Sequence, residues 1–389
     1  MKNFMTPNYA PAPFILTHGE GTKVWDMGGK EYLDFTSGIA VNSLGHAHPR
    51  VVEAIREQTG RLSHVSNMFH HEGYLKLCKK LCELSFGEMV FLCNSGAEAT
   101  EASIKLARKF FHRRGENRPK LIAFEGGFHG RTYGALSLTQ SPKAREGFGP
   151  FLPDITHVSY DDLEAVSRAI DQETAAVFIE PIQGNTGVRV PTPGFFKGLE
   201  ELCRKSGVLL VADEIQTGCG RTGRWFGYQH EDVTPDIMPL AKAMGGGLPL
   251  GAVVTSKPIG EALALGIHGS TFGGNPLACA SGLTTLEVIE DENLIRRAEM
   301  AGRAFINELR EIQKSTEIIS AVRGRGLMIG LELTTKAKPI LVACRESGLL
   351  ITVAGPKVLR ILPPLTTSDL EFTKALEILK KVVSTAHAT

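Results

Sequence analysis

Lys242 is the residue of this chain whose surroundings point most directly to covalent chemistry. It lies in the segment 235–251 among small and apolar residues, and three consecutive glycines begin three positions after it. A lysine whose pKa is lowered by burial or by a neighbouring cation becomes a neutral amine that attacks carbonyl carbons. An isolated lysine before a glycine turn is usually a solvated surface residue, so Lys242 needs a chemical partner elsewhere in the sequence.

An acidic residue upstream supplies such a partner. The run Val208–Ala212 is short, apolar and β-prone, and it is followed by Asp213 and then by a glycine-rich turn. A carboxylate at the tip of a buried strand, together with a lysine from a second segment, matches the requirements of pyridoxal phosphate (PLP). The lysine binds this cofactor covalently, and the aspartate keeps the pyridine nitrogen protonated so that the ring accepts electrons.

A helix start near residue 95 is a candidate phosphate site. Ser95 and Glu98 have the spacing of a capping box, and apolar residues then recur at helical intervals at Ala99, Ala102, Leu106 and Phe110. Ser95, Gly96 and Ala97 therefore open a helix directly after a strand. The free N–H groups there either serve an ordinary N-cap or bind a phosphate, to which Gly96 gives close access. Spacing alone leaves both interpretations open.

Three more side chains are candidates for ligand contacts. Phe128 and Arg131 lie on a glycine-rich loop after the strand predicted at Leu121–Phe124, and α/β sheets bind ligands at the carboxyl ends of their strands. Arg360 is flanked by apolar residues in a β-prone run. An arginine there needs a partner or a ligand unless it lies at an exposed edge, because burying it unpaired is costly.

These motifs resemble the class III pyridoxal-phosphate aminotransferases, specifically the acetylornithine aminotransferase family. The resemblance extends from Asn8 to about Ser368. It implies an α/β fold-type I PLP-dependent transferase, in which a large domain with a mainly parallel sheet is joined to a smaller α+β domain. The expected ranges are 1–50 for an N-terminal segment that packs with the small domain, 51–280 for the large PLP-binding domain and 281–389 for the small domain.

The resemblance assigns roles around the cofactor ring. Lys242 and Asp213 are expected to be catalytic, with Lys242 acting as general base and acid once the substrate amine has displaced it. Phe128 is expected to stack on one face of the ring and Ile215 to pack on the other. Gln216 is expected to hydrogen-bond the ring hydroxyl group.

The same resemblance implies contacts to the phosphate and to the substrate. The segment Ser95–Ala97 matches the family's phosphate cup, and Thr271 matches a threonine that reaches the partner subunit's cofactor in a homodimer. Arg131 and Arg360 match arginines that bind substrate carboxylates. Asn185 is a departure, because the family usually has a glutamate there, which pairs with the carboxylate-binding arginine while the amine donor is bound. An asparagine cannot neutralise that arginine, so the range of donors stays open.

The expected reaction is a two-stage transamination. The δ-amino group of N2-acetylornithine is transferred to 2-oxoglutarate, which gives N-acetylglutamate 5-semialdehyde and glutamate and serves arginine biosynthesis in the family. A different ω-amino donor, such as N-succinyl-diaminopimelate, ornithine or 4-aminobutyrate, is the first alternative, since a few pocket residues decide the donor. An aminomutase of the same fold and a catalytically silent binding protein are further alternatives.

An NAD-linked oxidoreductase is the alternative from another enzyme class. The segment Gly218–Gly223 literally fits the pattern G-x-G-x-x-G of dinucleotide-binding proteins. That motif must open a helix immediately after its strand, whereas five residues intervene here and the following residues are poor helix formers. The sequence context therefore argues against a dinucleotide site.

Bulk composition favours a cytoplasmic enzyme with small-molecule substrates. The 389 residues carry 43 Lys and Arg against 42 Asp and Glu, and this balance favours neither nucleic acid nor an anionic membrane as partner. No apolar run approaches the roughly 18 residues that span a bilayer, and the first residues lack the apolar core of a signal peptide. Seven cysteines are scattered without a Cys-x-x-Cys pair, and no metal site is expected.

Overall fold

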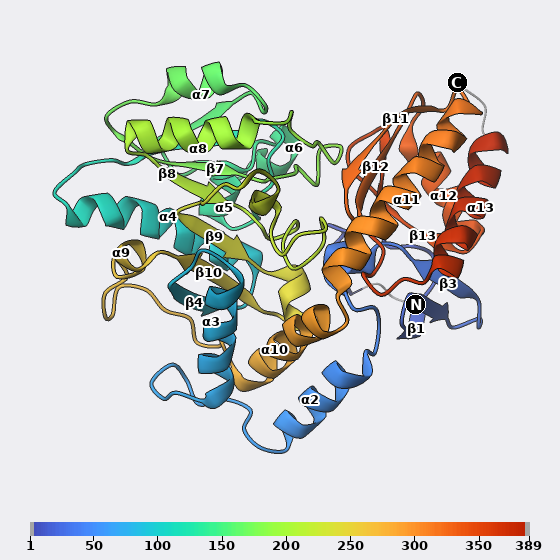
Figure 1. Cartoon of the computed structure of the whole chain (residues 1–389), viewed down its shortest axis with the longest axis horizontal. Coiled ribbons are helices and arrows are strands. Elements are labelled where there is room, and N and C mark those ends of the chain that lie inside the picture. Colours follow the sequence, from blue (N-terminus) through green and yellow to red (C-terminus); the bar gives the residue numbers. More distant parts are fainter. Residues whose placement is uncertain (1–3, 386–389) are drawn as a thin grey trace.

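The computed structural model describes residues 4–385, and its centre is a seven-stranded sheet (Figure 1). The strand order is β4-β10-β9-β8-β7-β5-β6. β10 is antiparallel to both of its neighbours, and the other neighbouring pairs are parallel. The mainly parallel sheet predicted from the sequence is therefore confirmed. The strands are β4 (Met89–Cys93), β5 (Lys120–Phe124), β6 (Ile155–Val158), β7 (Thr174–Ile179), β8 (Leu209–Ala212), β9 (Ile237–Leu240) and β10 (Gly251–Thr255).

The inner strands β7, β8, β9 and β10 are buried at every position. Parallel strands that are covered by helices on both faces carry such continuous apolar runs, without the alternation of a half-exposed sheet. The sequence patterns predict β5, β7, β8 and β10 to within one residue. They miss β9, because it has only four residues and one of them is Pro239.

Two helices show how the faces of the sheet are covered. Alternate residues of β5, β7 and β8 pack with α4 (Gly96–Arg113), whereas the residues between them pack with α8 (Phe195–Ser206). Side chains of a strand alternate between the two faces, so α4 and α8 lie on opposite sides of the sheet. The other elements of this part are α2 (Pro49–Thr59), α3 (Glu72–Leu84), α5 (Tyr133–Leu138), α6 (Pro142–Arg145), α7 (Leu163–Ala169), α9 (Lys257–Gly260), α10 (Pro276–Asp291), and the 3-10 turns η1 (Gly227–Glu231) and η2 (Lys242–Gly245).

The C-terminal part is built on an antiparallel sheet in the order β11-β12-β15-β14. In Figure 1 the long helices α11, α12 and α13 lie with this sheet on the side of the molecule away from α4 and α8. The elements are α11 (Leu294–Lys314), β11 (Ile319–Arg325), β12 (Met328–Leu333), α12 (Ala337–Glu346), β14 (Thr352–Val353), β15 (Val358–Ile361) and α13 (Asp369–Thr385).

The N-terminal strands join this C-terminal part rather than the central sheet. β1 (Leu16–Glu20), β2 (Lys23–Asp26) and β3 (Glu31–Asp34) form the predicted antiparallel meander. β3 then pairs in parallel with β13 (Leu349–Leu350), more than 300 residues further along the chain. The short α1 (Ser37–Ala40) follows and leads back toward the central sheet.

One predicted element differs from the structure. The sequence pattern predicts a long helical region from about Pro276 past Glu311, and this region consists of two helices, α10 and α11. Asn293 separates them with a φ of 53°, a left-handed conformation that asparagine tolerates better than most residues. The chain therefore turns between the two helices although the apolar pattern continues.

Candidate active site

Lys242 opens η2, directly after β9, and its backbone has a φ of 47°. A lysine adopts this left-handed conformation only at a cost, so the surrounding structure must hold it there. The side chain is partly buried. Burial lowers the pKa of its amine to about 8, and the charge of Arg360 acts in the same direction, whereas the charges of Asp213 and Glu180 oppose the shift. A large fraction of this amine is therefore neutral and nucleophilic in mildly alkaline solution.

Asp213 lies at the carboxyl end of β8 and is only 3% exposed. Its backbone N–H donates to the carbonyl of Ile179 at 2.7 Å, which ties it to the end of β7. Its Oδ2 lies 2.6 Å from Nδ1 of His129, and its Oδ1 accepts from the backbone N–H of Ile215 at 3.1 Å. Both carboxylate oxygens thus have partners that orient the group.

The buried His129 is held in its charged form by this pair. Burial works against the charge, but the hydrogen bond to Asp213 and the negative charges of Asp213 and Glu180 outweigh it and raise the pKa of His129. Asp213 therefore faces a group whose cationic form it favours. An ionised carboxylate at this place suits a protonated ring nitrogen as a ligand.

We expect the charge on His129 to stabilise the folded protein mainly below neutral pH. In the unfolded chain a histidine has a pKa of about 6.5. Because the pKa of His129 is higher than this in the folded protein, its charge contributes fully to the free energy of unfolding below about pH 6.5. The contribution is lost as the pH rises through the pKa of the folded state. Asparagine keeps an N–H donor but has no charge, so His129→Asn should cost less stability at about pH 9 than at about pH 6. Urea unfolding of both proteins measures this difference, and an equal cost at the two pH values would contradict a charged His129.

Glu180 connects two loops of the site from the end of β7. It is 5% exposed; its Oε1 accepts from the backbone N–H of Phe128 at 2.9 Å, and its Oε2 accepts from that of Gly184 at 3.3 Å. Burial raises the pKa of this carboxyl group to about 7; the charge of Asp213 adds to the shift, and that of His129 opposes it. Glu180 therefore positions the loop of the predicted stacking residue against the loop that follows β7.

Arg360 lies in β15 and is 4% exposed, so the alternative of an exposed edge position does not apply. Its Nη1 donates to the carbonyl of Gly184 at 3.0 Å, to Oδ1 of Asn185 at 2.6 Å and to Oε1 of Gln216 at 3.2 Å. Its Nε donates to Oγ1 of Thr352 at 3.1 Å. Burial lowers its pKa to about 10. No carboxylate of residues 4–385 lies within ion-pair distance of this guanidinium, so its charge is available for an anionic ligand.

The predicted helix start forms where β4 runs into α4. Oγ of Ser95 accepts from the backbone N–H of Glu98 at 3.2 Å, as the capping-box spacing predicts. The carboxylate of Glu98 reaches back to the N–H of Asn94 at 2.8 Å rather than to that of Ser95. The first N–H groups of a helix, here those of Gly96 and Ala97, have no partner within the helix and face outward for a ligand.

The start of α4 touches the segment that carries Asp213. A Cβ added to Gly96 would lie 2.9 Å from Cδ1 of Ile215, so only glycine lets Ile215 pack this closely. The donor set of this region fits pyridoxal phosphate, because it combines N–H groups for the phosphate, a carboxylate for the ring nitrogen and the Lys242 amine for the aldehyde.

Three other residues predicted for the site, Phe128, Arg131 and Thr271, make fewer contacts with the rest of the site. Phe128 is half-buried, and the guanidinium of Arg131 lies 5.4 Å from the centre of its ring. Arg131 itself is exposed. Thr271 is also exposed; its neighbour Ser270 accepts at Oγ from the Nδ2 of Asn94 at 3.1 Å. Thr271 thus lies on the outer side of the phosphate-cup region of its own chain.

Sequence reasoning did not identify His129 and Glu180 as site residues. His129 directly follows the predicted stacking residue Phe128, and Glu180 ends a predicted buried strand, so each had a local signal. The missing information was the partner: His129 meets Asp213 across 84 positions of sequence, and Glu180 meets Phe128 across 52. Residues 4–385 contain no group of three or more His, Cys, Asp or Glu placed to hold a metal ion.

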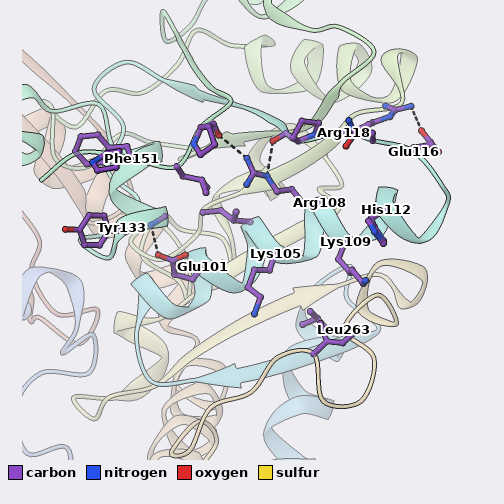
Figure 2. A pocket seen from close by; sticks show the side chains of 18 residues that line it. Glu101, Lys105, Arg108, Lys109, His112, Glu116, Arg118, Tyr133, Phe151 and Leu263 are labelled. Atoms are coloured by element: carbon purple, nitrogen blue, oxygen red, sulfur yellow. Dashed lines mark hydrogen bonds and ion pairs between the residues drawn. The ribbon is translucent and has the colours of Figure 1, made fainter.

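A separate groove of about 720 Å³ runs along one side of α4 (Figure 2). Its lining includes Glu101, Lys105 and Tyr133, and neither Lys242 nor Asp213 belongs to it. Figure 2 shows Glu101 turned toward the start of α5, where its Oε1 accepts backbone N–H groups. This groove is therefore distinct from the region of the lysine and the aspartate.

Similarity to aminotransferases extends over nearly the whole chain. The family model described as aminotransferase class-III matches residues 4–383. An acetylornithine aminotransferase of Methanopyrus kandleri is 47% identical, with 95% of this chain and 94% of the relative covered. An acetylornithine/succinyldiaminopimelate aminotransferase of Photorhabdus laumondii is 46% identical, with 98% and 96% covered.

A solved aminotransferase structure has the same fold as this chain. The ornithine aminotransferase of Toxoplasma gondii, whose active site was found partially occupied by PLP, superposes with a TM-score of 0.95. It is 38% identical in sequence, and the match covers 98% of this chain and 92% of that chain. The predicted fold class is thereby confirmed. The chain belongs to the aminotransferase class-III family and is a PLP-dependent aminotransferase.

Proposed function

We propose that this protein transfers the δ-amino group of N2-acetylornithine to 2-oxoglutarate, as a step of arginine biosynthesis. The donor's δ carbon becomes the aldehyde of N-acetylglutamate 5-semialdehyde, and the keto carbon of 2-oxoglutarate becomes the amine-bearing carbon of glutamate. The observation that carries the proposal is the Lys242 amine, whose pKa is lowered to about 8, within electrostatic reach of Asp213. The names of the two relatives from Methanopyrus and Photorhabdus support acetylornithine as the donor.

The residues around the cofactor have separable tasks in this proposal. Bound pyridoxal phosphate supplies an aldehyde that engages the amine and a protonated ring that accepts electrons from the substrate carbon. Ser95, Gly96 and Ala97 would hold its phosphate, and Asp213 would hold the proton on its ring nitrogen. Nζ of Lys242, once freed, would remove the proton from the donor's δ carbon as general base and deliver it, as general acid, to the cofactor carbon that carries the nitrogen.

The ring and the substrate are held by the remaining predicted residues. Phe128 and Ile215 would enclose the ring, and Gln216 would hydrogen-bond its hydroxyl group. Arg360 would bind a substrate carboxylate through two parallel N–H bonds, since its charge has no acidic partner. Arg131, exposed beside Phe128, would bind a second carboxylate at the mouth of the site.

Asn185 sets how freely Arg360 accepts a carboxylate, and changing it tests this role. A glutamate at position 185 should pair with Arg360, 2.6 Å from the present amide oxygen, and compete with the carboxylate of glutamate. We expect Asn185→Glu to shift the ratio of kcat/KM for acetylornithine over glutamate by about tenfold toward acetylornithine, which corresponds to about 1.4 kcal/mol. Asn185→Gln, which adds the same length without charge, is the control. An unchanged ratio in Asn185→Glu would show that this position does not rank the donors.

A screen of amine donors against 2-oxoglutarate tests the proposed substrate. N2-acetylornithine should give the highest rate of glutamate formation, followed by N-succinyl-diaminopimelate, which the name of the Photorhabdus relative favours as the second candidate. Ornithine and 4-aminobutyrate complete the panel. A clear preference for one of the other donors would replace acetylornithine and leave the aminotransferase chemistry intact.

We further propose a homodimer in which Thr271 reaches the partner subunit's cofactor. Two segments with exposed apolar side chains support this: Met68 and Phe69 in one, and Leu265 and Phe272 in the other. They are tied together, because Nδ2 of Asn67 donates to the carbonyl of Ser270 at 2.9 Å. Exposed apolar side chains on an ordered surface are typical of a protein interface. Sedimentation at varied concentration measures the assembly.

The domain ranges and the location also remain proposals. The pairing of β3 with β13 supports grouping residues 1–50 with the small domain at 281–389, around the large domain at 51–280. Residues 1–3 and 386–389 of these ranges lie outside the described part of the chain. Within residues 4–385, no helix combines the length and the apolar character required to cross a membrane. We propose a cytoplasmic location because the expected substrates are small metabolites.

A further inference from the structure

A cavity of about 300 Å³ lies between α11, the turn from β11 to β12, and the loop 222–230 that follows the cofactor-binding segment. Three arginines line it: Arg303 and Arg310 from α11, and Arg325 from the end of β11. Its only acidic lining residue is Glu299. The cavity thus brings together cations from two elements of the C-terminal part and faces a loop of the central part.

The guanidinium groups of this cavity have few hydrogen-bond partners. Arg303 lies 3.6 Å from Glu299, and Arg325 lies 3.9 Å from Glu231, so both ion pairs are longer than a hydrogen bond. Arg310 reaches a side-chain oxygen of α11 only at 3.5 Å. Each guanidinium has five N–H donors in a planar fork. Most of these donors remain available for a ligand.

The local charge balance is positive. Glu299 is shared between Arg303 and Arg224, whose Nη1 lies 3.2 Å from its Oε2, and Glu231 pairs with Arg325, so two carboxylates serve three arginines while Arg310 contacts the amide of Asn307. The half-buried ring of His230 responds to this field: burial lowers its pKa to about 4, and the charges of Arg325 and Arg224 add to the shift. A neutral histidine adds no further charge, and its Nε2 lies 3.1 Å from the carbonyl of Thr222. The arginines therefore make the electrostatic potential in the cavity positive.

We propose that this cavity binds a compact dianion, a phosphate or a short dicarboxylate, between Arg303, Arg310 and Arg325. Oxygen atoms of both ligand classes accept paired N–H bonds from guanidinium forks, and arginine favours this geometry over lysine. The volume of about 300 Å³ accommodates a compact anion of this kind. This site is separate from Arg360, and the inference does not depend on which amine donor the enzyme uses.

The cavity lies where the C-terminal part packs against the central part. Gly326, in the β11–β12 turn, packs directly against the backbone of Thr222, where a Cβ would overlap it. The same loop is anchored to the residue after Asp213, because the carboxylate of Glu214 accepts from the N–H groups of Gly227 and Tyr228, both at 2.8 Å. A ligand held by the arginines beside this loop therefore lies at the junction next to the segment that carries Asp213.

Isothermal titration of the holoenzyme with inorganic phosphate, in a slightly alkaline low-salt buffer, tests the site. The cofactor then fills its own phosphate cup, so added phosphate reports on other sites. We expect binding by the unmodified protein and a dissociation constant about tenfold or more higher in Arg325→Gln and in Arg310→Gln. Lys314→Gln, which removes an exposed charge of α11 outside the cavity, should leave it unchanged. Phosphate should also raise the thermal midpoint of the holoenzyme, and less so in the two arginine variants.

Succinate, titrated in the same way, distinguishes the two sources of the dianion. Succinate binding that weakens in Arg325→Gln assigns the site to dicarboxylates, and phosphate binding that weakens there assigns it to phosphates. Arg310 is exposed, so its variant remains informative even if Arg325→Gln folds poorly. The proposal is overturned if neither anion binds at millimolar concentration, or if binding is the same in both arginine variants as in the unmodified protein.

Discussion

Replacing Lys242 with alanine is expected to lower kcat by about four powers of ten or more and to abolish covalent retention of the cofactor. In the proposed mechanism two roles are lost together, since the same amine serves as the nucleophile for the cofactor and as the base for the substrate. A positioned general base alone contributes roughly two to four powers of ten. The charged groups that act on Lys242 are Asp213, Glu180 and Arg360, and none of these can replace the amine as the nucleophile for an aldehyde.

Three measurements separate this role from a structural one. Borohydride reduction followed by mass spectrometry should attach the cofactor to the unmodified protein and not to Lys242→Ala. Small primary amines added to Lys242→Ala should restore part of the turnover, since they replace the missing base. The apoprotein of the variant should unfold at the same or a higher temperature, because burial of a lysine amine opposes stability. Lys257→Ala, at the start of α9, is the matched control; normal turnover in Lys242→Ala would end the assignment.

Asp213→Asn is expected to lower kcat by roughly three powers of ten, equivalent to about 4 kcal/mol of barrier. The carboxylate at the end of β8 is the group that can hold a proton on the ring nitrogen, and an amide of the same size cannot. Its orientation depends on His129 at 2.6 Å and on the N–H of Ile215 at 3.1 Å. An asparagine keeps the latter bond and leaves His129 facing a neutral group.

The control for Asp213→Asn is a half-buried acid directly before β9 that lies outside the site. Asp236 accepts from the backbone N–H of Leu210 at 2.8 Å, a bond that Asn can also make, so Asp236→Asn should retain nearly full activity. The loss in Asp213→Asn should fall on kcat and kcat/KM together, because the interaction strengthens as charge develops on the ring. A fall in cofactor affinity with unchanged kcat at saturating cofactor would show that Asp213 binds the ring without activating it.

Most secondary elements of the central part followed from local pattern. Apolar runs that end on Asp213 or precede Phe128 predicted β8 and β5 to within one residue, because continuous apolar runs are required of strands buried on both faces. The pattern failed at β9, where a four-residue strand contains a proline, and at Asn293, where a left-handed residue divides two helices without interrupting the apolar periodicity.

The sequence predicted which residue types form the candidate site, but it predicted only a few of the contacts between them. Lys242, Asp213 and the helix start at Ser95 each follow a strand, and chemistry can be inferred from such positions. The partners could not be inferred. Arg360 meets Gln216 across 144 positions and Asn185 across 175, and these distances in sequence carry no local signal.

The sequence by itself determined the chemical groups, their order along the chain and the elements that carry them, since these follow from short-range periodicity and residue type. Three features depend on the folded arrangement: the pKa of His129 is raised beside Asp213, Arg360 is buried without an acidic partner among residues 4–385, and Lys242 is held at a positive φ with a lowered pKa. The physical reason is that burial and electrostatic pairing depend on strand order and packing, which bring together segments that no local pattern relates.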